Sequence, residues 1–133
     1  MKIRLLALAI AGLLVPVASA FAHHAFVAEY DAKKPITLTG VVTKVEWMNP
    51  HVFFYIDVKD SGGKVTNWRG EGGNLSGLMR RGWRKDSLKI GETVTIEGSL
   101  AKNGQALVNA RSVTLADGKK LFAGSSGGDE APQ

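Results

Sequence analysis

Three histidines are the residues of this 133-residue chain whose chemistry is most distinctive. His23 and His24 stand together near the amino terminus, and His51 directly follows an Asn-Pro pair. Histidine is the commonest metal ligand in proteins, and several nitrogen donors around one ion suit Cu(II). The three histidines are therefore the candidate metal ligands, and copper is the expected ion. The alternative is that the pair is a solvated start of the chain and that His51 only begins a strand.

The segment before the paired histidines has the order of an export signal. Basic residues Lys2 and Arg4 lead into an apolar run over residues 5–15, and small residues follow at positions 18, 20 and 22. This order is typical of a signal peptide, and the run is shorter than the roughly 20 residues that span a bilayer. We expect residues 1–22 to be removed, which would leave a periplasmic protein without a membrane span.

Two cleavage positions satisfy the small-residue rule, and each predicts a different copper chelate. Cleavage after Ala22 leaves His23 first, so its α-amine and imidazole can chelate one ion to which His51 adds a third nitrogen. Cleavage after Ala20 leaves Phe21 first, and the amine, two amides and the His23 imidazole then form a square-planar chelate. His24 is a spare ligand in either case, and the sequence leaves both positions open.

Several classes of protein are disfavoured by what the sequence lacks. The chain has no cysteine, which excludes disulfides, thiolate metal sites and thiol catalysis. It has no GxSxG segment, and its glycines at 70, 72 and 73 are not followed by the Lys-Ser or Lys-Thr of a phosphate loop. The net charge of +5 includes Lys2 and Arg4, so the processed chain would carry about +3, which is too mild to indicate a nucleic-acid partner. We expect no enzymatic activity and assign no catalytic residue.

The pattern of the remaining chain predicts a small all-β domain. Alternation of apolar and polar residues and the Asn103-Gly104 turn signal indicate strands separated by tight turns. The expected strands cover residues 36–47, 51–60, 64–71, 92–101 and 105–115, with a short helix over residues 74–82. This β-β-β-α-β-β order is that of an OB-like antiparallel barrel, here over residues 36–116, although an open antiparallel sandwich gives a similar pattern. Residues 23–35 are expected to be a lead-in segment and residues 117–133 a flexible tail.

An aromatic face on the expected barrel suggests a second function. Alternation places His51, Phe53 and Tyr55 on one side of their strand, and Trp68 comes from the next strand. Barrels of this type bind ligands by stacking on such faces. The alternative hypothesis is therefore a non-catalytic module that binds a periplasmic glycan, peptide or protein through Phe53, Tyr55 and Trp68. Against it, Phe53 and Trp68 are also typical core residues.

A basic cluster, MRRGWRK at residues 79–85, combines cationic and aromatic side chains. Such a cluster can engage an acidic polymer or lipid headgroups. Most basic runs are nevertheless solvated surface, and Trp83 is a candidate anchor in the core.

The chain resembles a family of small exported bacterial proteins of unknown function with an OB-like predicted architecture. The resemblance covers nearly all of the expected mature chain and lies in five segments, HHAF at 23–26, EYD at 29–31, VEWMNPH at 45–51, RRGWRKDSLKIGE at 80–92 and VTLADGKKLFAGSS at 113–126. It implies export and fold, and it supplies no catalytic residue.

Overall fold

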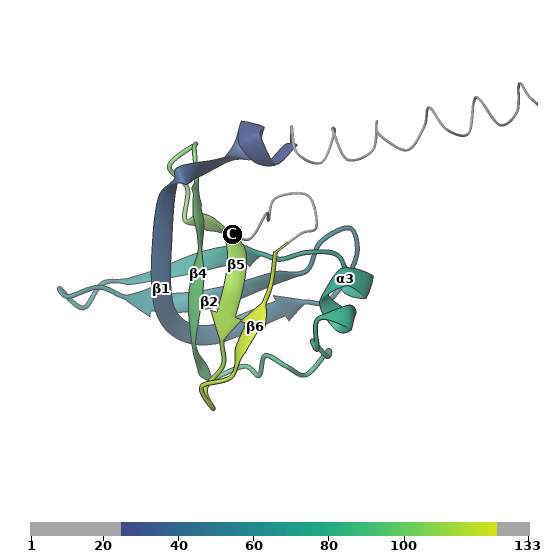
Figure 1. Ribbon diagram of the computed structural model, residues 1–133. Helices are drawn as coiled ribbons and strands as arrows, with labels where there is room; N and C mark the ends of the chain where they lie inside the picture. The colour runs from purple at the N-terminus through teal and green to yellow at the C-terminus, as the bar shows by residue number, and fades with distance from the viewer. Residues whose placement is uncertain (1–24, 125–133) are drawn as a thin grey trace, which may run out of the picture.

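A computed structural model of the protein describes residues 25–124 and shows a small barrel with a helical turn at residues 25–29 and a short helix, α3 (Figure 1). The elements follow the chain as β1 (Tyr30–Glu46), β2 (Phe53–Lys59), β3 (Val65–Glu71), α3 (Leu75–Arg80), β4 (Thr93–Ala101), β5 (Leu107–Thr114) and β6 (Lys120–Phe122). The sheet order is β3-β2-β1-β4-β5-β6, and an additional parallel pairing of β3 with β5 closes the sheet on itself. The predicted all-β fold is confirmed, and closure excludes the open sandwich.

The length of β1 allows it to pair with two neighbours. Its first part, residues 30–41, pairs with β4, and its last part, residues 41–46, pairs with β2. Figure 1 shows the strand curving around the barrel between these two partners. Gly40 lies where the partners change, and a Cβ atom there would lie 2.4 Å from the carbonyl oxygen of Asp57. The close approach of β2 at this position therefore requires glycine.

The core fills the inside of the barrel with side chains from alternate strand positions. Phe54 and Trp83 stack with ring centroids 6.2 Å apart, and the Trp83 indole donates a hydrogen bond to the Phe122 carbonyl at 2.8 Å. Gly70 makes room for this packing, because a Cβ atom there would lie 2.4 Å from the Phe54 ring. The buried core also includes Val42, Val52, Ile56, Leu78, Val94, Ile96, Val108 and Val113.

Helix α3 is shorter than the predicted helix over residues 74–82, but it begins as expected. Asn74 is its N-cap, and the Asn74 side chain accepts a hydrogen bond from the Gly77 amide at 2.8 Å. The Asn49 side chain accepts another from the Leu75 amide at 3.1 Å. These contacts fix the helix against the connection between β1 and β2. Within residues 25–124, no helix is long and apolar enough to cross a membrane.

The structure differs from the expected boundaries at the start of the barrel. β1 begins at Tyr30 rather than at residue 36, so the end of the expected lead-in, residues 30–35, is part of the strand. The pairing with β4 shifts register between Asp31 and Pro35, and Pro35 is exposed there. Proline has no backbone N–H group, so it disrupts a strand only where a neighbouring strand needs that hydrogen bond. At an irregular edge position this hydrogen bond is not required. The expected break at Pro35 is therefore wrong.

A second difference lies in the expected tail. β6 occupies Lys120–Phe122, within the expected flexible segment 117–133, and pairs with β5 after a turn in which Gly118 has a φ of 86°. The side chain of Leu121 is buried, and Lys120 forms an ion pair with Glu97 of β4. That ion pair, followed by a hydrogen bond from Ser112, lowers the pKa of the Glu97 carboxyl. The barrel therefore extends to Phe122, and residues 125–133 of the predicted tail lie outside the described residues.

The close approach at Gly40 gives a prediction about stability. We expect Gly40→Ala to lower the free energy of unfolding by about 1–3 kcal/mol, because the added methyl group must push β1 and β2 apart. Gly62→Ala is the control, since its Cβ would be 3.4 Å from the nearest atom, in the Asp60 side chain, and its effect should stay within about 0.5 kcal/mol. Urea unfolding measures both. Equal effects of the two substitutions would contradict the assigned strand approach.

Candidate functional site

A buried carboxylate at the end of β3 organises the polar residues of the candidate site. Glu71 is only 8% exposed, and both of its oxygens are engaged. Its Oε1 atom is 2.5 Å from Nδ1 of His51, and its Oε2 atom accepts a hydrogen bond from the Tyr30 hydroxyl. A buried carboxylate is strongly destabilising unless it is paired and hydrogen-bonded. The two contacts meet this requirement and join three distant parts of the chain.

Strand pairing explains why these side chains meet. Glu71 is opposite Phe53, the first residue of β2, and is also opposite Asn109 of the parallel neighbour β5. His51 lies two residues before β2 begins, and Tyr30 is the first residue of β1. The ends of three strands therefore converge at the carboxylate.

The segment that leads into Tyr30 is packed on the barrel. Residues 25–29 are helical, and the ring of Phe26 stacks on that of Tyr30 at 5.7 Å between centroids. Tyr30 is 3% exposed and forms a small second core with Ala101 and Leu107. The Glu29 carbonyl also accepts a hydrogen bond from the Lys102 amide at 2.9 Å. The lead-in is thus held against β4 and β5 by its side chains and its backbone.

The surroundings of Tyr30 keep its phenol protonated. Burial raises the pKa of Tyr30 far above its ordinary value of 10.0, and the hydrogen bond to Glu71 and the negative charge of that carboxylate raise it further. A neutral phenol is a hydrogen-bond donor, so Tyr30 holds one side of the Glu71 carboxylate and leaves the other side to His51.

His51 is the predicted metal ligand that the structure describes. Its side chain is 40% exposed, and its Nδ1 atom faces Glu71. No hydrogen bond involves its Nε2 atom within residues 25–124. A carboxylate at one ring nitrogen fixes the tautomer and leaves the lone pair of the other nitrogen available to a metal. The geometry of His51 therefore suits a metal ligand with a carboxylate behind it.

The other two predicted ligands, His23 and His24, lie outside the described residues. The described chain begins one residue later, at Ala25, and a helical rise of about 1.5 Å per residue places Ala25 roughly 7.5 Å along the axis from Tyr30. Among the described residues there is no group of three or more His, Cys, Asp or Glu side chains suited to a metal ion. A metal site at His51 would therefore need a ligand from residues before Ala25 or from outside the chain.

The predicted aromatic face is only partly correct. Phe53 and Tyr55 are half-buried on one side of β2, whereas Trp68 of β3 is opposite Ile56 and packs against the core. Directly opposed residues of antiparallel strands point to the same face, so Trp68 lies on the inner face with Ile56. The placement of Trp68 beside Phe53 and Tyr55 is thus wrong.

Cations cover the two rings that remain on the outer face. The guanidinium carbon of Arg69 is 4.0 Å from the centroid of the Phe53 ring, and Lys44 Nζ is 5.1 Å from that of Tyr55. Lys44 also pairs with Glu46 at 2.5 Å. Each ring therefore already has a cation–π partner on one face, which leaves less aromatic surface for a ligand to stack on.

Sequence reasoning missed Glu71 and Tyr30 as members of the site. The register of the hairpin around residues 61–63 could have placed Glu71 next to the start of β2. No local signal could have placed Tyr30, because its contact with Glu71 spans 41 positions of the chain and depends on closure of the barrel.

Comparison with known proteins identifies the family. A model described as a family of unknown function (DUF6152) matches residues 11–109, which is more than half of the chain. The chain belongs to this family. The predicted resemblance to a family of unknown function is confirmed, and it contributes no activity. No curated protein matches the chain.

The buried Tyr30–Glu71 contact gives a prediction. Tyr30→Phe should lower the free energy of unfolding by about 1–3 kcal/mol, because it leaves a buried carboxylate oxygen without its donor. Tyr55→Phe is the matched control, since the Tyr55 hydroxyl makes only a 3.4 Å contact with Glu46, and its effect should be within about 0.5 kcal/mol. Denaturant unfolding at neutral pH measures both changes. A Tyr30→Phe effect no larger than that of the control would contradict the assigned role of the hydroxyl.

Proposed function

We propose that this protein is a periplasmic copper-binding protein in which His51 and the amino-terminal histidine of the processed chain bind one Cu(II) ion. The observation that carries the proposal is the contact of Glu71 with both His51 and Tyr30. One carboxylate thereby orients a half-exposed imidazole and holds the segment that follows the paired histidines.

The orientation of His51 supports a role as ligand. Metal-bound histidines almost always donate their second ring N–H to a carboxylate, a carbonyl or a water. The Glu71 carboxylate provides this contact at Nδ1, and the exposure of the side chain gives an ion access to the ring. Glu71 would then raise the basicity of the ring and fix its direction.

The anchoring of residues 25–30 supports the contribution of the terminus. The Phe26–Tyr30 stack, the Lys102–Glu29 hydrogen bond and the Tyr30–Glu71 contact hold these residues on the barrel. Only one residue separates Ala25 from His23. Cleavage after Ala22 would free an α-amine beside the His23 imidazole and create a chelating pair of nitrogen donors. With His51, this pair would give the three-nitrogen set that suits Cu(II), so the proposal favours this cleavage position.

Calorimetric Cu(II) titration of the exported protein tests the proposal after intact-mass analysis has located its terminus. We expect Glu71→Gln to weaken copper binding by about 10-fold to 100-fold, as is usual when the partner of a histidine ligand is lost, and His51→Ala to weaken it more. Glu46→Gln is the matched control, because Glu46 is bonded to Lys44 and Tyr55 and forms no hydrogen bond or ion pair with His51 within residues 25–124.

Two results would contradict the proposal. One is a copper affinity unchanged by His51→Ala in a protein that circular dichroism shows to be folded. The other is an exported protein whose amino terminus lies downstream of both His23 and His24.

A further inference from the structure

Residues 79–90, from the end of α3 into the connection to β4, account for the net positive charge of the chain after residue 22. Residues 79–90 contain five cations and one carboxylate, a net charge of +4. Residues 23–133 contain 15 of the 17 basic residues, since Lys2 and Arg4 precede them, and all 12 acidic ones, a net charge of +3. The rest of that chain therefore sums to −1. The five cations are Arg80, Arg81, Arg84, Lys85 and Lys89.

These cations are not neutralised by carboxylates in the described part of the chain. Its ion pairs involve Lys44, His51 and Lys120, and none of the five. Two of the five are held by other contacts. Arg81 donates a hydrogen bond to the Gly124 carbonyl at 2.6 Å and lies over the Phe122 ring, and Arg84 donates one to the Trp83 carbonyl at 3.0 Å. These contacts hold Arg81 and Arg84 against the barrel, and all five cations are exposed.

Exposed apolar side chains accompany the cations. Ile90 is 72% exposed, the highest value among the exposed large hydrophobic residues of the described chain, and Met79 is 49% exposed. A shallow depression lies alongside, with Arg84 and Lys85 beside apolar walls made by Val45, Trp47, Val52, Trp83 and Leu88. The depression encloses no space for even a water molecule, so it is surface relief rather than a pocket for a small molecule.

We propose that this basic surface, formed by Arg80, Arg84, Lys85 and Lys89 with Met79 and Ile90, binds the headgroups of an anionic phospholipid bilayer. Each Lys or Arg near an anionic membrane strengthens binding about fivefold, and apolar side chains among the cations insert at the headgroup boundary. The near-neutral remainder of the chain adds little attraction elsewhere. A protein partner would need a contiguous apolar core inside a polar rim, whereas here the two exposed apolar residues stand at the two ends of the cationic run 79–90.

Membrane binding is independent of the copper proposal. None of the residues of the basic surface is among His23, His24 and His51, and among the described residues the side-chain hydrogen bonds of Glu71 are to Tyr30 and His51. The experiment is therefore made in the presence of a chelator, so that loss of copper binding cannot change its result.

Flotation of the exported protein with phosphatidylcholine vesicles, with and without phosphatidylglycerol, tests the proposal. We expect binding only to the anionic vesicles. The triple variant Arg80→Gln, Lys85→Gln and Lys89→Gln should bind them roughly 100-fold more weakly, because three cations are removed. These three side chains make no hydrogen bond or ion pair within residues 25–124, so the fold should be unaffected.

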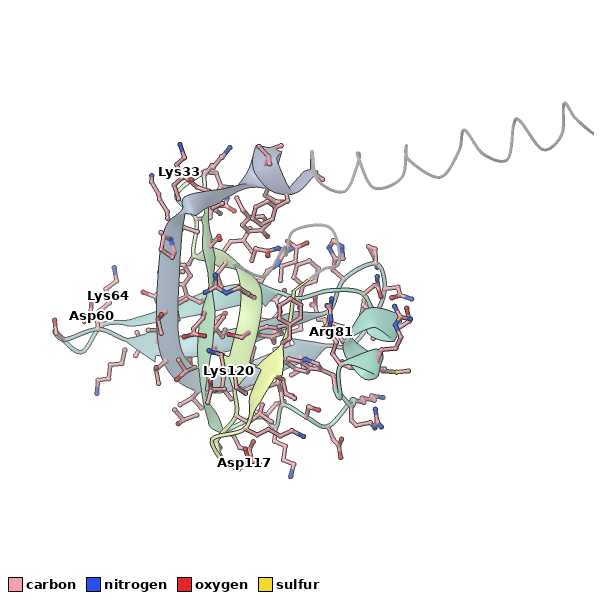
Figure 2. The ribbon with its side chains drawn as sticks, viewed as in Figure 1. Lys33, Asp60, Lys64, Arg81, Asp117 and Lys120 are labelled. Carbon is pink, nitrogen blue, oxygen red and sulfur yellow. The ribbon has the colours of Figure 1, made fainter. Side chains whose placement is uncertain are left out.

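The control is a triple variant with the same loss of charge elsewhere, Lys33→Gln, Lys34→Gln and Lys64→Gln. Figure 2 shows Lys33 and Lys64 on parts of the barrel away from Arg81. The control should bind within about twofold of the unaltered protein. Equal loss of vesicle binding in the two triple variants would mean that attraction depends on net charge alone, and it would overturn the proposal. Equal binding to neutral and anionic vesicles would also overturn it.

The apolar contribution separates a bilayer from a soluble acidic polymer. Ile90→Ser leaves the charge unchanged and should weaken binding to anionic vesicles severalfold, because it removes the inserted side chain. If Ile90→Ser has no effect and polyglutamate competes fully with the vesicles, the surface recognises acidic polymers and the lipid assignment is wrong.

Discussion

The structure of the candidate site depends on the burial of one carboxylate. Glu71 ends β3 in a position that is almost inaccessible to water, so its charge must be met by partners from the protein. Tyr30 and His51 both bind the Glu71 carboxylate. Tyr30 begins β1, and His51 follows the end of β1. Loss of either contact would leave a buried carboxylate oxygen without a hydrogen-bond partner. The Glu71 carboxylate therefore holds both the lead-in segment, through Tyr30, and the connection before β2, through His51. A residue whose burial is unfavourable by itself thereby specifies the arrangement of its neighbours.

The barrel makes this arrangement possible through its closure. Parallel pairing of β3 with β5 places Glu71 beside Asn109 and brings Leu107 under Tyr30. Gly70, next to Glu71, leaves the space that the Phe54 ring fills, so β3 can pack tightly against the core. The apolar interior and the polar site therefore lie on opposite faces of β3. The basic surface lies in a different part of the chain, on the connection from α3 to β4.

Local patterns predict the strand order, the short helix and its Asn74 cap, but not the contacts that depend on closure. The alternation of β2 correctly separates Phe53 and Tyr55 from Phe54 and Ile56. It cannot give the face of Trp68, because that face depends on the register between β2 and β3, which places Trp68 opposite Ile56. β6 has only three residues and is stabilised by its pairing with β5. Because the surrounding sequence is polar and contains glycine, it gives no strand signal there. His51 is recognisable as a potential ligand from sequence, whereas Glu71 and Tyr30 emerge only from the closed barrel.

The proposed copper site requires that His51 and the processed terminus bind one ion together. Pulsed electron paramagnetic resonance of the exported protein with one equivalent of Cu(II) tests it directly, because the spectrum reports how many imidazoles coordinate the ion. We predict two coordinated imidazoles in the unaltered protein and one in His51→Ala. The same number of imidazoles in both proteins would show that His51 is not a ligand and would contradict the account.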